Sequence, residues 1–146
     1  MRVGIPGSGL MGRRLGTLFA RVRHEVVFSY VRSQKKLEGL ARAGTPGEVA
    51  RHVAALLLAV HWSRMDDVLK QAGDLSKKVI VSCSLPMNES NADLVVGHIS
   101  SGVEELSRML PKARVVSAFN TLPSEVLFEV YEAKRKASPE CGVLGR

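Results

Sequence analysis

The segment Arg2–Gly12, RVGIPGSGLMG, decides the fold of this chain. A short strand pattern, Arg2–Pro6, runs into Gly7-Ser8-Gly9-Leu10-Met11-Gly12, and apolar residues at helical spacing follow over Leu10–Val22. In such a strand–turn–helix unit the first glycine permits the tight turn, the second lets the backbone approach a phosphate group, and the third lets the helix pack closely on the strand. N–H groups at the start of the helix face the same phosphate. This context favours a phosphate-binding loop over a purely structural glycine turn.

The rest of the chain alternates between strand and helix patterns. Val53–Val60 (VAALLLAV) is an unbroken apolar run, too short for a typical helix, that suits a parallel strand buried on both faces. The alternation predicts a single-domain α/β fold: a doubly wound, mostly parallel Rossmann sheet of about five to six strands. The expected strands are Arg2–Pro6, Glu25–Tyr30, Val53–Val60, Lys78–Cys83 and Arg114–Ala118; the expected helices are Leu10–Val22, Lys35–Arg42, Pro46–Arg51, Arg64–Ala72, Val103–Leu110 and Ser124–Lys136.

Two further expectations concern the arrangement of these elements. The first helix is expected to turn Leu10, Leu15, Leu18 and Phe19 toward the sheet. Ligands of such sheets bind beyond the carboxyl ends of the strands, at the point where the strand order reverses. The usual order puts that switch point between the first and fourth strands.

Composition limits the class of protein. A chain of 146 residues, 45% hydrophobic and 24% charged, is long enough for one domain with its own core. No apolar run reaches the ~20 residues of a membrane helix, and Arg13 and Arg14 interrupt the first apolar stretch, unlike a signal peptide. Cys83 and Cys141 form neither a disulfide framework nor a metal-binding pattern. We therefore expect a cytoplasmic protein with no membrane segment and no metal site.

The net charge of +7 lies entirely in the first third of the sequence. Met1–Arg42 holds nine Lys or Arg residues against two acids, whereas residues 43–146 are balanced. Basic surfaces often bind nucleic acid, but here the basic residues are interleaved with strand and helix patterns and no aromatic stacking platform accompanies them. The charge suits a phosphate-rich small molecule, and nucleic acid is not an expected partner.

The residues after the second strand indicate which dinucleotide binds. NAD sites usually place an acid ≈ 20 residues beyond the glycines to bind the ribose 2′-hydroxyl, but no acid lies between Val26 and Leu37. The segment instead offers hydroxyls, a guanidinium and ammonium groups, which a 2′-phosphate favours. NADP(H) is therefore the expected cofactor. The alternative is a solvated loop with ordinary surface charges, which would have the same kind of sequence. The residues concerned are Ser29, Tyr30, Arg32, Ser33, Lys35 and Lys36.

The sequence resembles the NADPH-dependent reductases of the deazaflavin coenzyme F420, also described as F420-dependent NADP oxidoreductases, and the related oxidoreductase domain of the STEAP metalloreductases. The resemblance covers roughly residues 1–131, and its most specific segment is Val115–Leu122, VVSAFNTL. The other matching segments are Val3–Gly12 (VGIPGSGLMG), His24–Val27 (HEVV), Leu58–Trp62 (LAVHW) and Ala72–Leu75 (AGDL).

The resemblance implies hydride transfer between NADPH and a second planar carrier, F420 or a flavin. This agrees with a sequence in which we find no nucleophile–base pair and no triad, because both reactive atoms belong to cofactors; no catalytic residue is assigned. The resemblance also suggests that the backbone near His61 and Asn120 touches the nicotinamide, although His61 is equally compatible with packing at a strand end. The expected cofactor-binding residues are Gly7, Ser8, Gly9, Leu10, Met11, Gly12, Ser29, Arg32, Ser33, Lys36, Val60, His61, Cys83, Ala118 and Asn120.

Two departures from the family pattern leave alternatives open. Ser82–Pro86 (SCSLP) stands where the family often has Asp-Ala-Thr-Asn-Pro, and the family's members are longer than this chain. We expect an NADP-binding domain over residues 1–131, a divergent tail over 132–146, a C-terminally truncated chain and a homo-oligomer that covers an exposed sheet edge. The alternatives are an NADP-binding module without turnover and an NADP-dependent reductase of a small carbonyl or imine.

Overall fold

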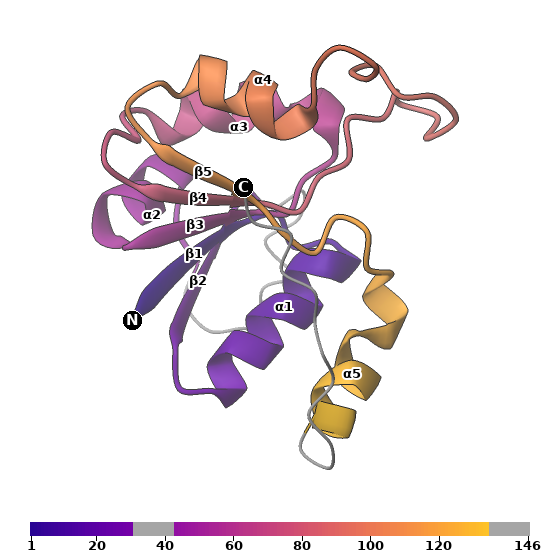
Figure 1. Ribbon diagram of the computed structural model, residues 1–146. Coiled ribbons are helices and arrows are strands. Elements are labelled where there is room, and N and C mark those ends of the chain that lie inside the picture. The colour runs from indigo at the N-terminus through magenta and orange to yellow at the C-terminus, as the bar shows by residue number, and fades with distance from the viewer. Residues whose placement is uncertain (31–42, 135–146) are drawn as a thin grey trace.

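The fold is a parallel sheet with helices on both faces (Figure 1). The computed structural model describes residues 1–30 and 43–134. It confirms the predicted single α/β domain, with five strands in the order β2-β1-β3-β4-β5, all parallel. The strands are β1 (Arg2–Pro6), β2 (Glu25–Ser29), β3 (Ala55–Leu58), β4 (Val79–Ser82) and β5 (Arg114–Ser117); the helices are α1 (Leu10–Arg21), α2 (Pro46–His52), α3 (Met65–Ala72), α4 (Gly102–Met109) and α5 (Leu127–Lys134), with short 3₁₀ turns η2 (Trp62–Arg64) and η3 (Ser124–Val126). The expected helix Lys35–Arg42 lies outside the described residues.

The strand order corrects the expected position of the switch point. β1 pairs with β2 on one side and with β3 on the other, so the order reverses between β1 and β3 rather than between the first and fourth strands. The reason lies at the outer side of β2. There Phe28 and Ala43 form a single parallel bridge, and the Gly44 N–H donates to the Phe28 carbonyl at 3.1 Å. Within residues 1–30 and 43–134, a single bridge stands where the usual sheet has a full strand, so each strand that follows is numbered one lower than in the usual order.

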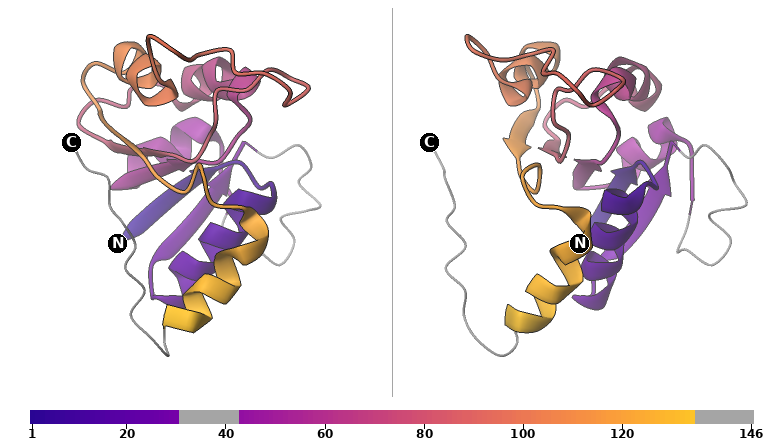
Figure 2. Two further views of the ribbon diagram at one scale, coloured as in Figure 1. Left: turned by 45° about the vertical axis from the view of Figure 1, so that its right-hand side comes forward. Right: turned by 90° about the vertical axis from the view of Figure 1, so that its right-hand side faces the viewer.

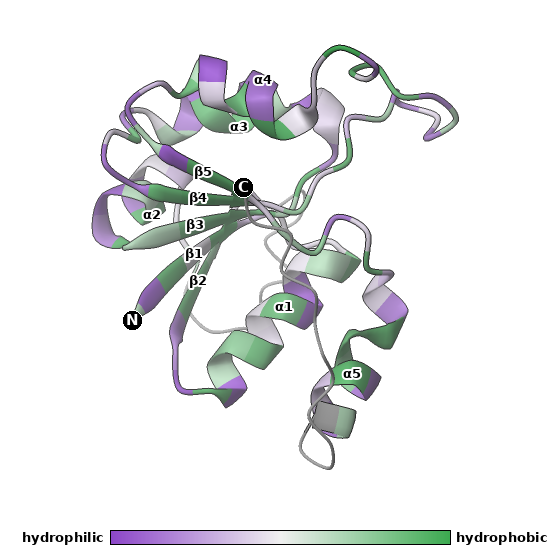
Figure 3. Cartoon of the chain, in the orientation of Figure 1, coloured by the Kyte–Doolittle hydropathy of each residue, from purple (hydrophilic) through white to green (hydrophobic). Residues whose placement is uncertain are grey.

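Each face of the sheet has its own hydrophobic core. Helices α2, α3 and α4 cover one face, and α1 and α5 lie side by side on the other (Figure 2). Leu56 and Leu58 of β3 enter the first core and Leu57 the second, and all three are at most 1% exposed. This confirms the expectation that the apolar run is a strand buried on both faces, and Figure 3 shows the central strands as the most hydrophobic part of the molecule.

Helix α1 packs on the sheet along most of its length, but not through its first residue. Leu15 is buried, and Leu18 and Phe19 pack against the same core, as expected. Leu10 contradicts the expectation, because its side chain is 65% exposed. Leu10 is the first residue of α1 and follows directly from the loop beyond β1, where the strand beneath the helix has already ended.

Among the residues described, no helix combines the length and the apolar character needed to cross a bilayer.

Gly16 offers a test of how closely α1 approaches the sheet. A Cβ atom there would lie 2.5 Å from Cζ of Phe28 and 3.1 Å from Cδ1 of Ile5, both in the core. We expect Gly16→Ala to lower the free energy of unfolding by ~1–3 kcal/mol, because overpacking outweighs the gain in helix propensity. Urea denaturation measures this. Gly97→Ala is the matched control, since its Cβ would meet nothing closer than 3.8 Å, and equal stability of the two variants would contradict the packing argument.

Candidate functional site

The carboxyl ends of the strands form one continuous edge, tied together by backbone hydrogen bonds. The Gly7 N–H donates to the Ser29 carbonyl at 2.9 Å, and the Ala59 N–H donates to Pro6 at 3.0 Å. Beyond β3, the Cys83 N–H donates to the Leu58 carbonyl and the Ala118 N–H donates to the Ser82 carbonyl, each at 3.0 Å. The segments that follow the five strands are therefore held in fixed positions relative to one another, which a binding site requires.

The three glycines of the loop have different surroundings. Gly7 has a φ of +107°, and a Cβ there would lie 2.3 Å from the Ala59 carbonyl oxygen; a Cβ on Gly12 would lie 2.2 Å from the Gly7 carbonyl oxygen. Gly9 differs, because its φ is −67° and a Cβ would meet nothing within 4 Å. Internal packing thus requires Gly7 and Gly12, whereas the space beside Gly9 is open. This is the pattern of a loop in which the second glycine makes room for a ligand.

The start of α1 is suited to an anion. Gly9 is the N-cap residue and supplies no side-chain hydrogen bond, and the first turn contains no acid. The first helical hydrogen bond is donated by Arg13 to Gly9, at 3.0 Å, and the Arg13 side chain is exposed. The N–H groups of Leu10, Met11 and Gly12 have no acceptor within the described parts of the chain. A phosphate placed beside Gly9 would meet free N–H donors and the positive end of the helix dipole.

Arg14, the neighbouring cation, serves the structure instead. Its guanidinium donates to the Ser124 carbonyl at 2.7 Å and lies 5.8 Å from the ring centre of Phe128. Arg21, two turns along α1, lies 5.1 Å from the same ring and forms an ion pair with Glu132 at 3.1 Å. These contacts fasten α5 to α1, so part of the basic excess of the N-terminal third has a packing role.

The expected 2′-phosphate segment is described only at its beginning. Ser29 is fully buried; its hydroxyl has no hydrogen-bond partner within residues 1–30 and 43–134, while its carbonyl anchors Gly7. Tyr30 has a φ of 55°, and its hydroxyl donates to Asp67 of α3, which lowers the pKa of that carboxyl together with a hydrogen bond from Gln71. The Tyr30–Asp67 contact was not predicted from the sequence. Arg32, Ser33, Lys35 and Lys36 lie outside the described residues.

His61 and Val60 follow β3 beside the glycine loop. Val60 is half-buried next to Gly7, and its carbonyl accepts a hydrogen bond from the Ser84 hydroxyl at 2.5 Å. His61 caps η2: the Ser63 N–H donates to Nδ1 at 3.3 Å, and Nε2 lies 3.0 Å from Oδ1 of Asn91. The sequence left function and packing equally open for His61, and the structure shows both ring nitrogens engaged in hydrogen bonds.

The segments after β4 and β5 complete the edge. Cys83 is buried in the core shared by α1 and α5, and burial raises the pKa of its thiol to about 12, so the side chain is an apolar filler. Ala118 is fixed by its bond to Ser82, and Phe119 follows with a φ of 64° and an exposed ring. Asn120 is half-buried, with no hydrogen-bond partner within the described residues. Its amide is therefore available to a ligand.

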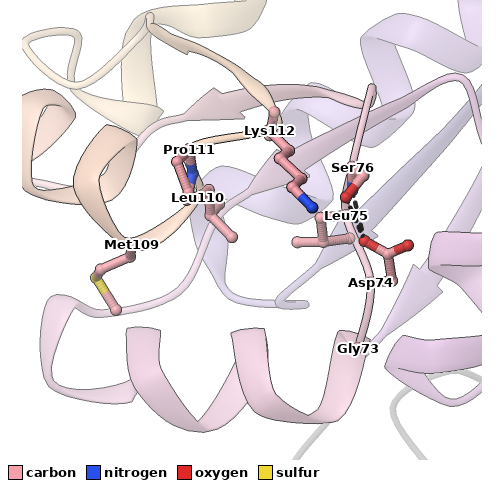
Figure 4. Close-up of a pocket in the computed structure, with 9 residues that line it drawn as sticks. Gly73, Asp74, Leu75, Ser76, Met109, Leu110, Pro111 and Lys112 are labelled. Carbon is pink, nitrogen blue, oxygen red and sulfur yellow. Dashed lines mark hydrogen bonds between the residues drawn. The ribbon is translucent and has the colours of Figure 1, made fainter.

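A groove of about 170 Å³ lies at the opposite end of the sheet (Figure 4). It is formed where residues 73–76 lead into β4 and residues 109–113 lead into β5. In it, Asp74 accepts hydrogen bonds from the Ser76 N–H and hydroxyl, which lower the pKa of the Asp74 carboxyl. No cofactor-binding residue predicted from the sequence lines this groove, and its Asp74 and Ser76 side chains are hydrogen-bonded to each other. The candidate site remains the carboxyl edge.

Within the described residues, no three His, Cys, Asp or Glu side chains gather in a group that could hold a metal ion.

The strand, the glycine loop and the helix at the switch point define a Rossmann-type dinucleotide-binding domain. The model of one family, described as NADP oxidoreductase, coenzyme F420-dependent, matches residues 2–86, more than half of the chain. The chain belongs to this family, which confirms the resemblance seen in the sequence. The domain thus belongs to a family of NADP-dependent oxidoreductases.

Solved structures share the fold at low sequence identity. A protein from Arthrobacter sp. FB24, proposed to be an F420-dependent NADP reductase, is 23% identical with a TM-score of 0.76; the match covers 86% of this chain and 65% of that one. A reductive aminase from Aspergillus terreus in complex with NADPH is 16% identical with a TM-score of 0.67, and the match covers 86% of this chain and 43% of that one. An imine reductase from Bacillus cereus is 18% identical with a TM-score of 0.66, and the match covers 92% of this chain and 51% of that one. The chain spans 65% of the length of the Arthrobacter protein.

The contrast between Gly9 and Gly12 yields a matched pair of variants. Gly9→Val should abolish NADPH binding and leave the circular dichroism spectrum unchanged, because its Cβ enters open space with no atom of the protein within 4 Å. Gly12→Ala should instead lower the free energy of unfolding, because its Cβ would collide with the Gly7 carbonyl. Titration calorimetry and thermal denaturation separate the two effects. If Gly9→Val bound NADPH normally, the pyrophosphate would have to lie elsewhere.

Proposed function

We propose that this chain binds NADP(H) at the glycine loop and transfers a hydride between it and a deazaflavin of the F420 type or a flavin. The observation that carries the proposal is the open space at Gly9, between two glycines that packing requires, in a member of the F420-dependent NADP oxidoreductase family. When bound, the nicotinamide supplies the hydride. The chain's own part is to bind the two reactants, to orient their rings and to exclude water.

Each part of the edge has a task under this proposal. The N–H groups of Leu10, Met11 and Gly12 would hold the pyrophosphate, and exposed Arg13 adds positive charge nearby. The 2′-phosphate would be bound by Arg32, Ser33 and Lys36, as the sequence predicts. At the other end, the backbone of Val60, His61, Cys83 and Ala118 would border the nicotinamide, and the Asn120 amide would hydrogen-bond its carboxamide. Direct hydride transfer then depends on holding two rings at ~3–3.5 Å.

A second candidate acceptor is a small imine or carbonyl compound. It is favoured by the fold shared with a reductive aminase in complex with NADPH and with an imine reductase. The third candidate is an NADP-binding module without turnover. All three candidates share the same dinucleotide site and differ only in the acceptor.

The proposal includes self-association through β5. Within the described residues β5 pairs only with β4, and Val116 on β5 is 48% exposed. Uncovered backbone N–H and C=O groups beside an exposed valine form an edge to which a second chain can add. A second copy would shield this edge close to Phe119 and Asn120, which follow β5 directly.

Cofactor preference tests the 2′-phosphate assignment. NADPH should bind at least ~10-fold more tightly than NADH, equivalent to ~1.4 kcal/mol, and Arg32→Ala should remove most of that difference. Calorimetry with both dinucleotides measures it. Arg23→Ala, an exposed arginine that precedes β2 at the far end of the strand, serves as the charge-matched control. Equal affinity of the unaltered protein for NADPH and NADH would refute the assignment.

Turnover tests the acceptor. NADPH oxidation is followed by absorbance with F420, FMN and a cyclic imine as acceptors, over a dilution series run alongside sedimentation. We expect oxidation with F420 or FMN, with specific activity rising as the protein associates, because a second copy completes the acceptor side. Oxidation with the imine alone would favour the small imine or carbonyl acceptor. Tight NADPH binding without any oxidation would favour a binding module without turnover. Full activity from a monomer at every dilution would contradict the role given to β5.

A further inference from the structure

The amino ends of the strands, opposite the candidate site, carry a row of basic residues. Each of the five strands begins with a Lys or Arg or closely follows one, and because all the strands are parallel these residues lie on one edge of the sheet. Figure 3 shows hydrophilic residues where β1 and β5 begin, in contrast to the hydrophobic middle of the sheet. The residues are Arg2 at β1, Arg23 before β2, Arg51 before β3, Lys77 and Lys78 before β4, and Lys112 and Arg114 at β5.

Hydrogen bonds hold this amino edge in a fixed shape. The Glu25 N–H donates to the Met1 carbonyl at 3.0 Å, and the Arg114 N–H donates to the Lys78 carbonyl at 2.9 Å. The half-buried Lys78 ammonium donates to the Val53 carbonyl at 2.9 Å, so this cation serves the fold. Because neighbouring strands lie about 4.8 Å apart, the edge extends ~19 Å from β2 to β5. Side chains along it keep a constant spacing.

Five of these cations, called the basic row below, are exposed and form no ion pair within residues 1–30 and 43–134: Arg23, Arg51, Lys77, Lys112 and Arg114. Arg2, by contrast, pairs with Glu25 at 2.9 Å. A second acid at this edge is Asp74, whose carboxyl pKa is lowered first by hydrogen bonds from Ser76 and then by the charge of Lys112. The basic row therefore leaves an excess of positive charge along the edge.

Two members of the basic row occupy backbone positions that favour glycine. Arg23 and Lys77 each have a φ of 63°, in the left-handed region. Glycine adopts this φ without strain, whereas an arginine or a lysine is strained there. The backbone conformation therefore does not explain why these two turns carry cations, which points to a use for their charge.

The spacing and chemistry of the basic row suit a chain of phosphates. Five cations over ~19 Å amount to about one per 4 Å, close to the one phosphate per ~3.4 Å on each strand of a duplex. Arg23, Arg51 and Arg114 can each bind a phosphate through two N–H groups. Lysines are depleted at the cores of protein interfaces, which use aromatic anchors instead. Phe19, the aromatic residue near this edge, packs against His24 and the core, which leaves the backbone of a duplex and not its bases as the surface to be bound.

We propose that the basic row binds the sugar–phosphate backbone of double-stranded nucleic acid without sequence preference. This activity goes beyond the proposed dinucleotide site, which lies at the other end of the strands, so one domain can hold both ligands at once. From the sequence, nucleic acid is not an expected partner, because the excess charge lies in residues 1–42. The basic row takes all of its cations except Arg23 from the balanced remainder of the chain, and only the fold brings them together.

Salt dependence measures how many phosphates the basic row contacts. The probe is a fluorescein-labelled DNA duplex about 20 base pairs long, titrated with the protein and read by anisotropy. Five contacts predict a slope of about −4.5 for log K against log salt, so doubling the NaCl concentration from about 50 mM should weaken binding about 20-fold. Two duplexes of unrelated sequence should bind equally, and saturating NADPH should leave their Kd unchanged. No binding at the lower salt concentration, a slope near zero, or competition by NADPH would overturn the inference.

Single substitutions locate the bound duplex on the protein. Lys77→Gly suits the local φ and Arg51→Gln replaces an exposed side chain, so both variants should keep the melting temperature and the NADPH affinity of the unaltered protein. Each should reduce the salt slope by about 1 and raise the Kd of the duplex about tenfold at low salt. Arg64→Gln, an exposed arginine of η2 at the opposite end of the strands, is the charge-matched control. An equal effect of Arg64→Gln would contradict the location.

Two other polyanions separate nucleic acid from the alternative partners. Polyglutamate of matched charge and vesicles of phosphatidylcholine with phosphatidylserine are titrated at the same salt concentration as the duplex. The duplex should bind more tightly than either of them. Tighter binding of polyglutamate would assign the basic row to an acidic protein segment, and tighter binding of the vesicles would assign it to a membrane surface. Either result would overturn the inference.

Discussion

The close contact between the glycine loop and the end of β3 is the constraint on which the rest of the domain depends. Gly7 and Gly12 have no room for a side chain because Ala59 and the loop backbone fill that space. This packing brings the start of α1 against the end of β1 and the residue that follows β3. A side chain at either glycine would push the helix away from the sheet, and both the core under Leu15 and the anion site would be lost together.

The edge beyond the strands combines rigid and variable parts. Backbone hydrogen bonds between successive strand ends, from Ser29 across to Ala118, involve no functional side chain. The segments that leave this edge are irregular, namely the glycine loop, the stretch after β3 and the segment between β4 and α4, and under the proposed function they bind the cofactors. Such a division allows one sheet to carry different functional segments.

The sequence was sufficient for features that depend on local pattern. The apolar run at Leu56–Leu58 predicts a strand buried on both faces, and the spacing of Gly7, Gly9 and Gly12 predicts the loop; both follow from which residues fit a given backbone. It failed where the outcome depends on distant parts of the chain. Helical spacing could not reveal that Leu10 lies beyond the end of the strand. Strand counting could not reveal that, among the described residues, only the Ala43 bridge pairs with the outer side of β2. The contacts of His61 with Asn91 and of Tyr30 with Asp67 join residues 30 or more positions apart, which no local pattern reports.

The charge at the first turn of α1 links cofactor binding to the stability of the protein. This turn carries no acid to offset the helix dipole, has no side-chain cap, and is followed by two arginines. Without a ligand, the residues of α1 itself therefore leave the positive end of this helix uncompensated. Under the proposed function, a bound pyrophosphate supplies the missing negative charge. Cofactor binding and folding are then linked equilibria, in which NADP(H) raises the melting temperature and lowers the fraction of chains open to proteases. The cellular supply of the dinucleotide would set the abundance of the protein as well as its activity.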